Sequence, residues 1–343
     1  MKHKTFFWFF LPTASAMILF IALPIFSIVV QSLFTPHDAV IIVTENCDPF
    51  GCKQETTIDQ EATRDLRKSE PLGKFVGLEI YKDRGHLAVS EIKEIWAESD
   101  NFSDFRNNIG NLPFYRAMAF TLTFTFTVTP LMLIFGFIIA LAVNSLHQNL
   151  KGLTIFFSLL PMIVSPLIGS LVLFWMIDSR GIIGEALQYV FEDPDLSLKA
   201  STGLTWVMLI VYGVWHAAPF SFVVFYAGLQ TLPMDTIESA RIDGASRLQQ
   251  IWYVVIPHLM PLITFVALMQ LMDNFRVFEP IVGFSAEAHA QSLSWFIFND
   301  LGGETRLLSS AATSSVLTII GVSILLFPVL LRTWRDFNEK SSK

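Results

Sequence analysis

Six apolar runs, each long enough to cross a lipid bilayer, dominate the sequence. They cover residues 6–34, 114–143, 153–177, 204–229, 262–284 and 307–331. A transmembrane helix needs about 20 predominantly apolar residues, because the hydrocarbon core is about 30 Å thick and each helical residue advances by about 1.5 Å. The chain is also 52% hydrophobic and only 15% charged, whereas a soluble domain carries about a quarter charged residues. The sequence therefore predicts an all-α polytopic membrane protein with six transmembrane helices.

The first apolar run is too long for the core of a cleaved signal peptide, which is about 7–15 residues. We therefore expect it to remain as the first helix. Lys2 and Lys4 precede this run, Lys151 lies in the connection after the second run, and Arg332 and Arg335 follow the last one. Because basic residues near transmembrane helices stay in the cytoplasm, we expect both termini on the cytoplasmic side of the membrane.

A hydrophilic segment, residues 35–113, separates the first two runs. It is too long for a bare loop, so we expect a small folded extracytoplasmic insert, with strands near 74–81 and a helix near 90–97. Whether the insert is a docking surface or has no binding role stays open. Cys47 and Cys52, both in this segment, either form a local disulfide or remain free thiols, and a zinc site would lack two further ligands.

These features divide the chain into three parts. Residues 1–34 form the N-terminus and first helix, 35–113 the insert, and 114–343 a five-helix transmembrane core with a cytoplasmic loop at 233–257. Within the core, Pro161 and Pro166 are expected to break the third run, which neighbouring helices can accommodate in a membrane bundle.

The polar segment 235–257 lies between the fourth and fifth runs and has a helical pattern. Its apolar residues recur with helical spacing at Ile237, Ala240, Ala245, Leu248 and Ile251. Asp235 with Glu238, and Ser246 with Gln249, have the spacing of N-cap pairs, and Gly244 between them suits a left-handed helix stop. The pattern predicts a helix, a sharp bend and a second helix.

This segment resembles the cytoplasmic signature loop, or EAA motif, of permease subunits in binding-protein-dependent ABC importers. The family pattern is Glu-Ala-Ala, three residues, Gly, nine residues, then Ile-x-Leu-Pro. The matching residues here are Glu238, Ser239, Ala240, Gly244, Val254, Ile256 and Pro257. Ser239, Val254 and Ile256 depart from the pattern by small or apolar exchanges. The run Glu-x-Ala-x-x-Asp-Gly-Ala is most similar to the carbohydrate branch that includes the maltose transporter, with an alpha-glucoside permease as one possibility.

The resemblance implies the fold of a type I ABC importer permease and a role in importing an oligosaccharide or glucoside. Its implied partners are an extracytoplasmic sugar-binding protein, a second homologous permease and a dimer of ATPase subunits that hold ATP and Mg²⁺. The chain itself would catalyse nothing, in agreement with its lack of a G-x-x-x-x-G-K-[ST] phosphate-binding loop. We expect no metal site and no nucleic-acid binding. The residues that would contact the ATPase are Ile237, Glu238, Ala240, Asp243, Gly244 and Ala245.

Polar and aromatic residues inside the fourth and fifth runs mark a candidate substrate site, because polar groups are costly in a bilayer and tend to face a cavity. They are Trp215, His216, Phe220, Gln270, Asp273 and Asn274. Amides and carboxylates bond sugar hydroxyls, and aromatic rings stack on the apolar face of a sugar. The resemblance places Gly213, His216, Ala217, Phe220, Gln270 and Asn274 at the sugar site, although Gly213 and Gln270 differ from what the family leads us to expect.

Several alternatives stay open at this stage. His216 could be a packing residue, and Asp273 and Arg276, three residues apart, could neutralise each other. With Glu279 they could instead couple an ion gradient in a secondary transporter. An ABC permease for a non-sugar solute is a further alternative. A membrane-embedded enzyme is disfavoured because the chain has neither H-E-x-x-H nor G-x-S-x-G.

Overall fold

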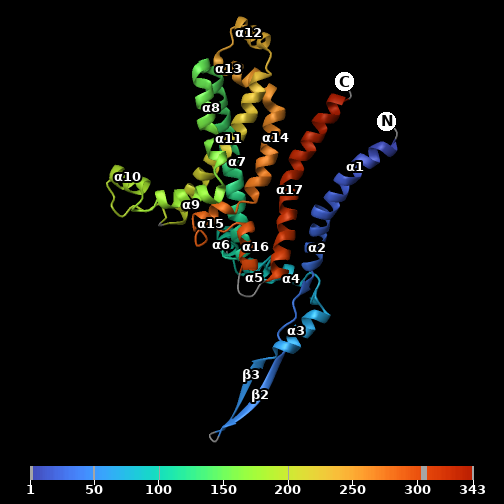
Figure 1. The fold of residues 1–343 in the computed structure, drawn as a ribbon. Coiled ribbons are helices and arrows are strands. Elements are labelled where there is room, and N and C mark those ends of the chain that lie inside the picture. Colours follow the sequence, from blue (N-terminus) through green and yellow to red (C-terminus); the bar gives the residue numbers. More distant parts are fainter. Residues whose placement is uncertain (1–2, 49–50, 100, 200, 303–306, 342–343) are drawn as a thin grey trace. The chain divides into compact units, whose positions relative to one another are not determined.

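The computed structural model describes residues 3–48, 51–99, 101–199, 201–302 and 307–341, and it is almost entirely helical (Figure 1). Five helices in this part of the chain are long and apolar enough to cross a membrane. They are Phe6–Gln31, Pro113–Ser145, Thr202–Gln230, Arg247–Phe275 and Leu308–Leu331. A bent pair of helices completes a sixth span if the pair is counted as one. The predicted helical membrane fold is therefore confirmed.

The bent pair replaces the third predicted run. Helix α8 (Gln148–Ile163) ends two residues before α9 (Pro166–Met176), and the two axes differ by 95°. Val164 between them is extended and Ser165 is also non-helical, with ψ angles of 130° and 136°. Pro166 begins α9 because proline is well tolerated in the first turn of a helix, whereas Pro161 stays inside α8.

The fifth predicted run, 262–284, has the wrong boundaries. A short helix α13 (Arg247–Gln250), a π-helical turn η2 (Ile251–Val255) and α14 (Ile256–Phe275) form one candidate span. The span therefore begins inside the segment that we assigned to the cytoplasmic loop and ends before Arg276. The short helix α15 (Glu279–Gly283) follows.

The contacts between residues divide the chain into two compact units, 1–115 with 296–320 and 116–295 with 321–343. This division does not follow the three segments expected from the sequence, because part of the C-terminal region joins the N-terminal residues. The segmentation into first helix, insert and core stays a prediction.

The first unit contains a helical N-terminus, the insert and parts of α16 (Leu293–Gly302) and α17 (Leu308–Ser341). Its N-terminal helix consists of α1 (His3–Met17), η1 (Ile18–Ala22) and α2 (Leu23–Gln31). The insert contains β1 (Phe34–Thr35) paired with β4 (Lys74–Phe75), and a hairpin of β2 (Ile41–Asp48) with β3 (Gly51–Ile58). Its helices are α3 (Gln60–Ser69), α4 (Glu79–Lys82), α5 (Val89–Glu98) and α6 (Phe102–Ile109). Thus α5 covers the segment expected to be helical, whereas only β4 forms where strands were expected at 74–81.

Hydrogen bonds hold the insert to the other elements of this unit. His86 lies 3.1 Å from the carbonyl oxygen of Ser310, whose hydroxyl donates to Asp300 over 2.6 Å. In the hairpin, the backbones of Cys47 and Cys52 are directly opposite each other. Their side chains lie outside the described part of the structure, so the disulfide stays a prediction.

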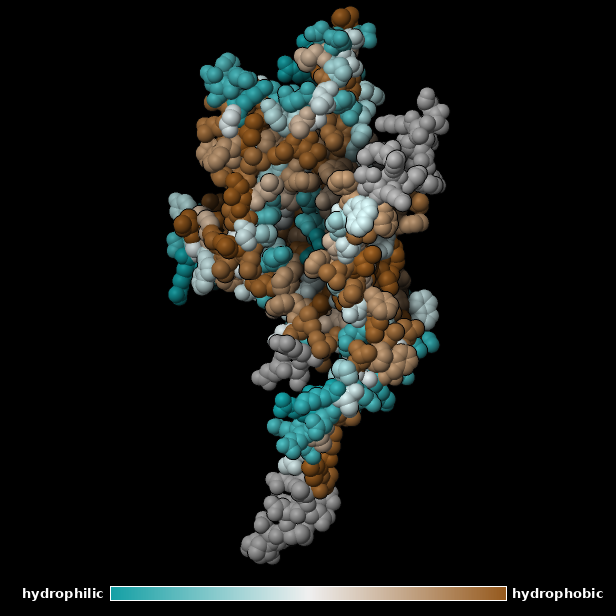
Figure 2. Space-filling view, turned by 45° about the vertical axis from the view of Figure 1, so that its right-hand side comes forward, coloured by the Kyte–Doolittle hydropathy of each residue, from teal (hydrophilic) through white to brown (hydrophobic). Residues whose placement is uncertain are grey.

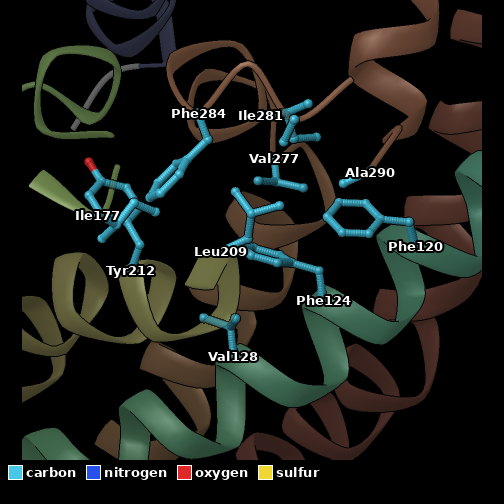
Figure 3. Close-up of a cluster of buried hydrophobic side chains, with 11 residues drawn as sticks. Phe120, Phe124, Val128, Ile177, Leu209, Tyr212, Val277, Ile281, Phe284 and Ala290 are labelled. Atoms are coloured by element: carbon cyan, nitrogen blue, oxygen red, sulfur yellow. The ribbon is translucent and has the colours of Figure 1, made fainter. Parts of the chain in front are cut away.

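The second unit is built on α7 (Pro113–Ser145), α11 (Thr202–Gln230) and α14. Close approach of α7 and α11 depends on Gly136, where an added Cβ would lie 2.8 Å from the backbone nitrogen of Phe222. Two buried apolar clusters fill this unit, one of them around Phe120, Phe124, Leu209 and Tyr212 (Figure 3). Figure 2 shows hydrophobic residues over much of the helical surface and hydrophilic residues gathered at the end that carries α12 (Met234–Ile242).

Candidate functional site

A cavity of about 670 Å³ lies within the second unit, among α7, the α8–α9 break, α11, α14 and α15. Its lining residues are Phe124, Met162, Pro166, Tyr212, Gly213, His216, Ala217, Phe220, Met269, Gln270, Met272, Asp273, Asn274, Arg276, Val277, Glu279 and Pro280. A volume of this size suits a small-molecule ligand. Phe124, Tyr212 and Val277 also belong to the buried cluster of Figure 3, so part of the cavity wall is the packed core itself.

One face of α11 lines the cavity. Residues spaced by one, four, five and eight positions share a helix face, and Tyr212, Gly213, His216, Ala217 and Phe220 have this spacing. The structure therefore places His216 and Phe220, two residues singled out in the sequence, in the lining. Trp215 lies outside the lining and is 44% exposed, because it is on another face of the helix.

The α11 face also holds the broken span in place. His216 donates through Nε2 to the carbonyl oxygen of Val164 over 3.1 Å, and the Tyr212 hydroxyl donates to the carbonyl oxygen of Pro166 over 2.7 Å. Val164 lies in the break, where its carbonyl has no helical partner and lipid cannot bond it. His216 thus serves the packing role that the sequence left as an alternative, while its ring also lines the cavity. Tyr212 was not among the predicted site residues.

The face of α14 brings the three polar candidates together. Gln270, Asp273 and Asn274 all line the cavity, as expected for positions three and four apart. Asn274 is buried and donates through Nδ2 to the Thr129 hydroxyl of α7 over 2.9 Å. Gln270 is 8% exposed, and its Oε1 is buried with no hydrogen-bond partner among the described residues.

The charges of the cavity leave an acidic excess. Arg276 bonds Asp273 over 3.0 Å, with the two side chains 58% and 68% exposed. Such an exposed pair contributes little to stability. It nevertheless engages the guanidinium of Arg276, the basic side chain of the lining, in a bond to Asp273. Glu279 is a second acid in the lining. Within the described residues, no group of three or more His, Cys, Asp or Glu side chains could hold a metal.

The predicted coupling segment forms the expected helix, bend and helix. Helix α12 ends before Gly244, which has φ +82° and open space around its Cα. Only glycine adopts this conformation readily. Ser246 and Gln249 form a reciprocal capping box, with Gln249 Oε1 accepting from the Ser246 backbone over 2.8 Å. The cap expected from Asp235 is wrong, because Pro233 occupies the N-cap position and Asp235 lies in the first turn.

The exposed surface of this segment differs from the face that the sequence indicated. Ile237, Ala240 and Ala245 are half-buried, whereas Glu238, Asp243 and Gly244 are exposed. The largest exposed apolar side chains belong to residues that were not chosen. They are Met234, Ile242, Leu248, Trp252 and Tyr253, of which Ile242 is 86% exposed. The helical spacing of these residues could have indicated them as exposed. The sequence alone, however, does not show which apolar residues of the segment pack against the membrane span.

Residues 132–278 match a family model described as "Binding-protein-dependent transport system inner membrane component". This segment belongs to that family of permeases. The matched segment contains α11, the coupling segment and α14, and therefore most of the cavity lining. The resemblance stated from the signature loop is thus confirmed.

Individual relatives agree with this assignment. The chain is 30% identical over 193 residues to the multiple sugar-binding transport system permease protein MsmF of Streptococcus mutans, covering 54% of this chain and 64% of the relative. It is 30% identical over 190 residues to the probable ABC transporter permease protein YesP of Bacillus subtilis, covering 54% and 59%. It is 28% identical over 214 residues to the sn-glycerol-3-phosphate transport system permease protein UgpA of Brucella suis, covering 60% and 71%. The alignment thus spans less than two thirds of the first two relatives.

A solved structure shows the same fold. A chain of a bacterial ABC transporter involved in the import of the acidic polysaccharide alginate superposes on this chain with a TM-score of 0.58 and 20% identity, covering 80% of this chain and 98% of that chain. At this identity the likeness concerns the fold alone.

Proposed function

We propose that this permease is a membrane-spanning subunit of an ATP-driven importer for a neutral carbohydrate, an oligosaccharide or a glucoside. The observation that supports it is the cavity of about 670 Å³ on the same family-matched segment as the signature loop, with amide and aromatic residues on facing helices. Gln270 and Asn274 offer hydrogen bonds to hydroxyls, while Phe124 and Phe220 offer apolar surface to a ring.

The charge of the lining supports a neutral ligand. Asp273 and Glu279 outnumber Arg276, which is already paired with Asp273. A sugar acid or sugar phosphate would therefore meet repulsion at close range and no free guanidinium. The transporter with the similar fold imports alginate, an acidic polysaccharide, and UgpA belongs to a glycerol-3-phosphate system, so the proposed ligand differs in charge from both.

The proposed partners follow from the family. They are a second homologous permease, an ATPase dimer that binds ATP and Mg²⁺, and an extracytoplasmic sugar-binding protein. Both termini and the α12–α13 segment would lie in the cytoplasm. There the exposed Glu238, Asp243 and Gly244, with the apolar Ile242 and Leu248 beside them, would contact an ATPase subunit. ATP hydrolysis would belong to that subunit and not to this chain.

Gentle solubilisation of the tagged full chain from native membranes tests the assembly. We expect an ATPase and a second multi-span protein to co-purify with it. Gly244→Glu forces a bulky residue into a left-handed conformation, so it should weaken ATPase capture. Gly244→Asn is the matched control, because asparagine tolerates this conformation better than other residues. Recovery of the chain without an ATPase, even after crosslinking, together with uptake driven by an ion gradient, would establish a secondary transporter instead.

Uptake by the reconstituted complex tests the ligand. Neutral glucosides should compete for uptake, and the corresponding uronates should not. Equal competition by both would refute the selection by charge while leaving the ATPase assignment intact.

A further inference from the structure

We propose that α9 and α10 (Ile182–Phe191) form an arm that lies in a membrane–water interface and binds lipid through one apolar surface. The arm belongs entirely to the second unit. Figure 1 shows α9 running across the direction of α8, in agreement with the 95° bend.

The length of α8 sets the depth of the arm. With 16 residues, α8 is about 24 Å long at a rise of about 1.5 Å per residue. It starts after a short turn that follows α7, so it begins at one face of the bilayer. The hydrocarbon core is about 30 Å thick, and the break therefore lies within about 6 Å of the opposite face. If α8 crosses the bilayer steeply, α9 runs nearly parallel to the membrane plane at that interface.

Both helices of the arm present apolar side chains outward. On α9, Ile168, Val172 and Trp175 are exposed, and on α10 so are Ile182, Tyr189 and Val190. The three α9 residues are spaced by three, four and seven. On α10, Tyr189 follows Ile182 by seven residues and Val190 comes next, so the exposed apolar side chains of each helix lie on one side of it. Tyr189 is 88% exposed. Trp and Tyr are the residues enriched at membrane–water interfaces, where the ring is buried and the polar atom stays wet.

The opposite face of α10 is already occupied by this unit. An added Cβ at Gly184 would collide with the carbonyl group of Asp178, and Gln188 donates to the carbonyl oxygen of Leu196 over 3.1 Å. Lys199 bonds Asp178 over 2.8 Å and lies 3.3 Å above the Phe174 ring. The arm is therefore fixed in place, and its apolar stripe is not free to fold inward.

Continuity with the rest of the surface identifies lipid as the occupant. Helix α8 exposes Phe156, Phe157 and Ile163, which a membrane span turns toward acyl chains, and the exposed apolar residues of α9 continue this surface. Glu192, Asp193 and Asp195 follow the arm and are exposed, while the nearby Lys199 is paired. Arg180, in the link between α9 and α10, is also exposed, but the three acids outnumber this cation. An acidic excess disfavours anionic headgroups, so the arm suits a zwitterionic lipid such as phosphatidylcholine.

Spin-label accessibility in phosphatidylcholine nanodiscs tests the proposal on the full chain with Cys47→Ser and Cys52→Ser. Labels are placed at Val190→Cys in the stripe and at Asp195→Cys in the exposed acidic segment that follows the arm. The ratio of collisions with oxygen to collisions with a water-soluble nickel complex should be several-fold higher at Val190 than at Asp195. Val172→Cys on α9 gives a second outward position in case a label on α10 disturbs the fold.

Two results would overturn the inference. Equal access of the nickel complex to the Val190 and Asp195 labels would place the arm in water. Shielding of the Val190 and Val172 labels from oxygen and nickel alike would show that protein covers the stripe, as at a contact with a second permease.

Discussion

Replacing Gln270 with methionine is expected to stabilise the fold while weakening ligand binding. Gln270 is 8% exposed, and its Oε1 is buried with no partner among the described residues. A buried acceptor without a hydrogen bond costs about 1–3 kcal/mol. Methionine has a similar volume and helix propensity, so the exchange creates neither a void nor a strained helix.

The two expected effects have opposite signs. Removing the unsatisfied oxygen should raise the free energy of unfolding by up to about 1–3 kcal/mol, or roughly 2–4 °C in Tm per kcal/mol for a unit of this size. Loss of the amide from the cavity removes one hydrogen bond to the ligand, worth about 0.5–1.5 kcal/mol. That loss corresponds to an increase of about 2- to 12-fold in the KM of uptake.

Thermal unfolding of the purified chain in detergent, followed by tryptophan fluorescence, measures the first effect, and uptake by the reconstituted complex measures the second. Thr264→Val is the matched control on the same helix. It removes a hydroxyl that already donates to the Met260 carbonyl oxygen over 2.9 Å and lies outside the cavity lining, so it should give neither a gain in Tm nor a change in KM. A lower Tm for Gln270→Met would refute the reasoning, since it would mean that Oε1 has a partner.

Three further predictions concern the scaffold of the site. His216→Leu leaves the Val164 carbonyl oxygen without its donor and should lower stability by about 1–3 kcal/mol, whereas His216→Gln should retain most of it; equal losses in unfolding assays would remove His216 from the break. The hydrogen bond from Lys199 lowers the pKa of the Asp178 carboxyl. This pair should therefore stabilise the arm fully above about pH 5 and lose that effect only as the pH falls through the lowered pKa. Asp178→Asn should remove this fall of the Tm at acid pH, and an unchanged dependence of the Tm on pH would contradict the prediction. Gly136→Val should prevent close packing of α7 and α11 and abolish recovery of folded chain, as judged by size-exclusion chromatography, and normal recovery would show that the two helices can separate.

The sequence predicted the polar wall of the cavity because α14 keeps its amides and acid within one turn. Gln270 and Asn274 are four residues apart, so any helix brings them to one side. Spacing could not show in the same way that Tyr212, and not Trp215, is the α11 residue that lines the cavity. This helix is apolar all round, so periodicity does not show which face meets the protein and which meets lipid.

Local chemistry was predicted better than tertiary geometry. The capping box at Ser246 and the left-handed glycine at Gly244 depend on a few neighbouring residues, and both are present. Pro166 indicated a break in the third span, but the bend of 95° depends on donors from α11 that are about 50 residues away. Hydropathy likewise did not show that the fifth span begins at Arg247, because polar residues in its first turns resemble a loop.

The exposed apolar residues of the coupling segment have a consequence for how the cell handles the chain. Met234 and Ile242 of α12 are 65% and 86% exposed, and apolar side chains exposed outside the membrane promote aggregation and recognition by proteases. On the proposed assembly, a bound ATPase subunit covers these side chains. The amount of this chain that accumulates should therefore follow the supply of its ATPase, because unassembled copies are degraded.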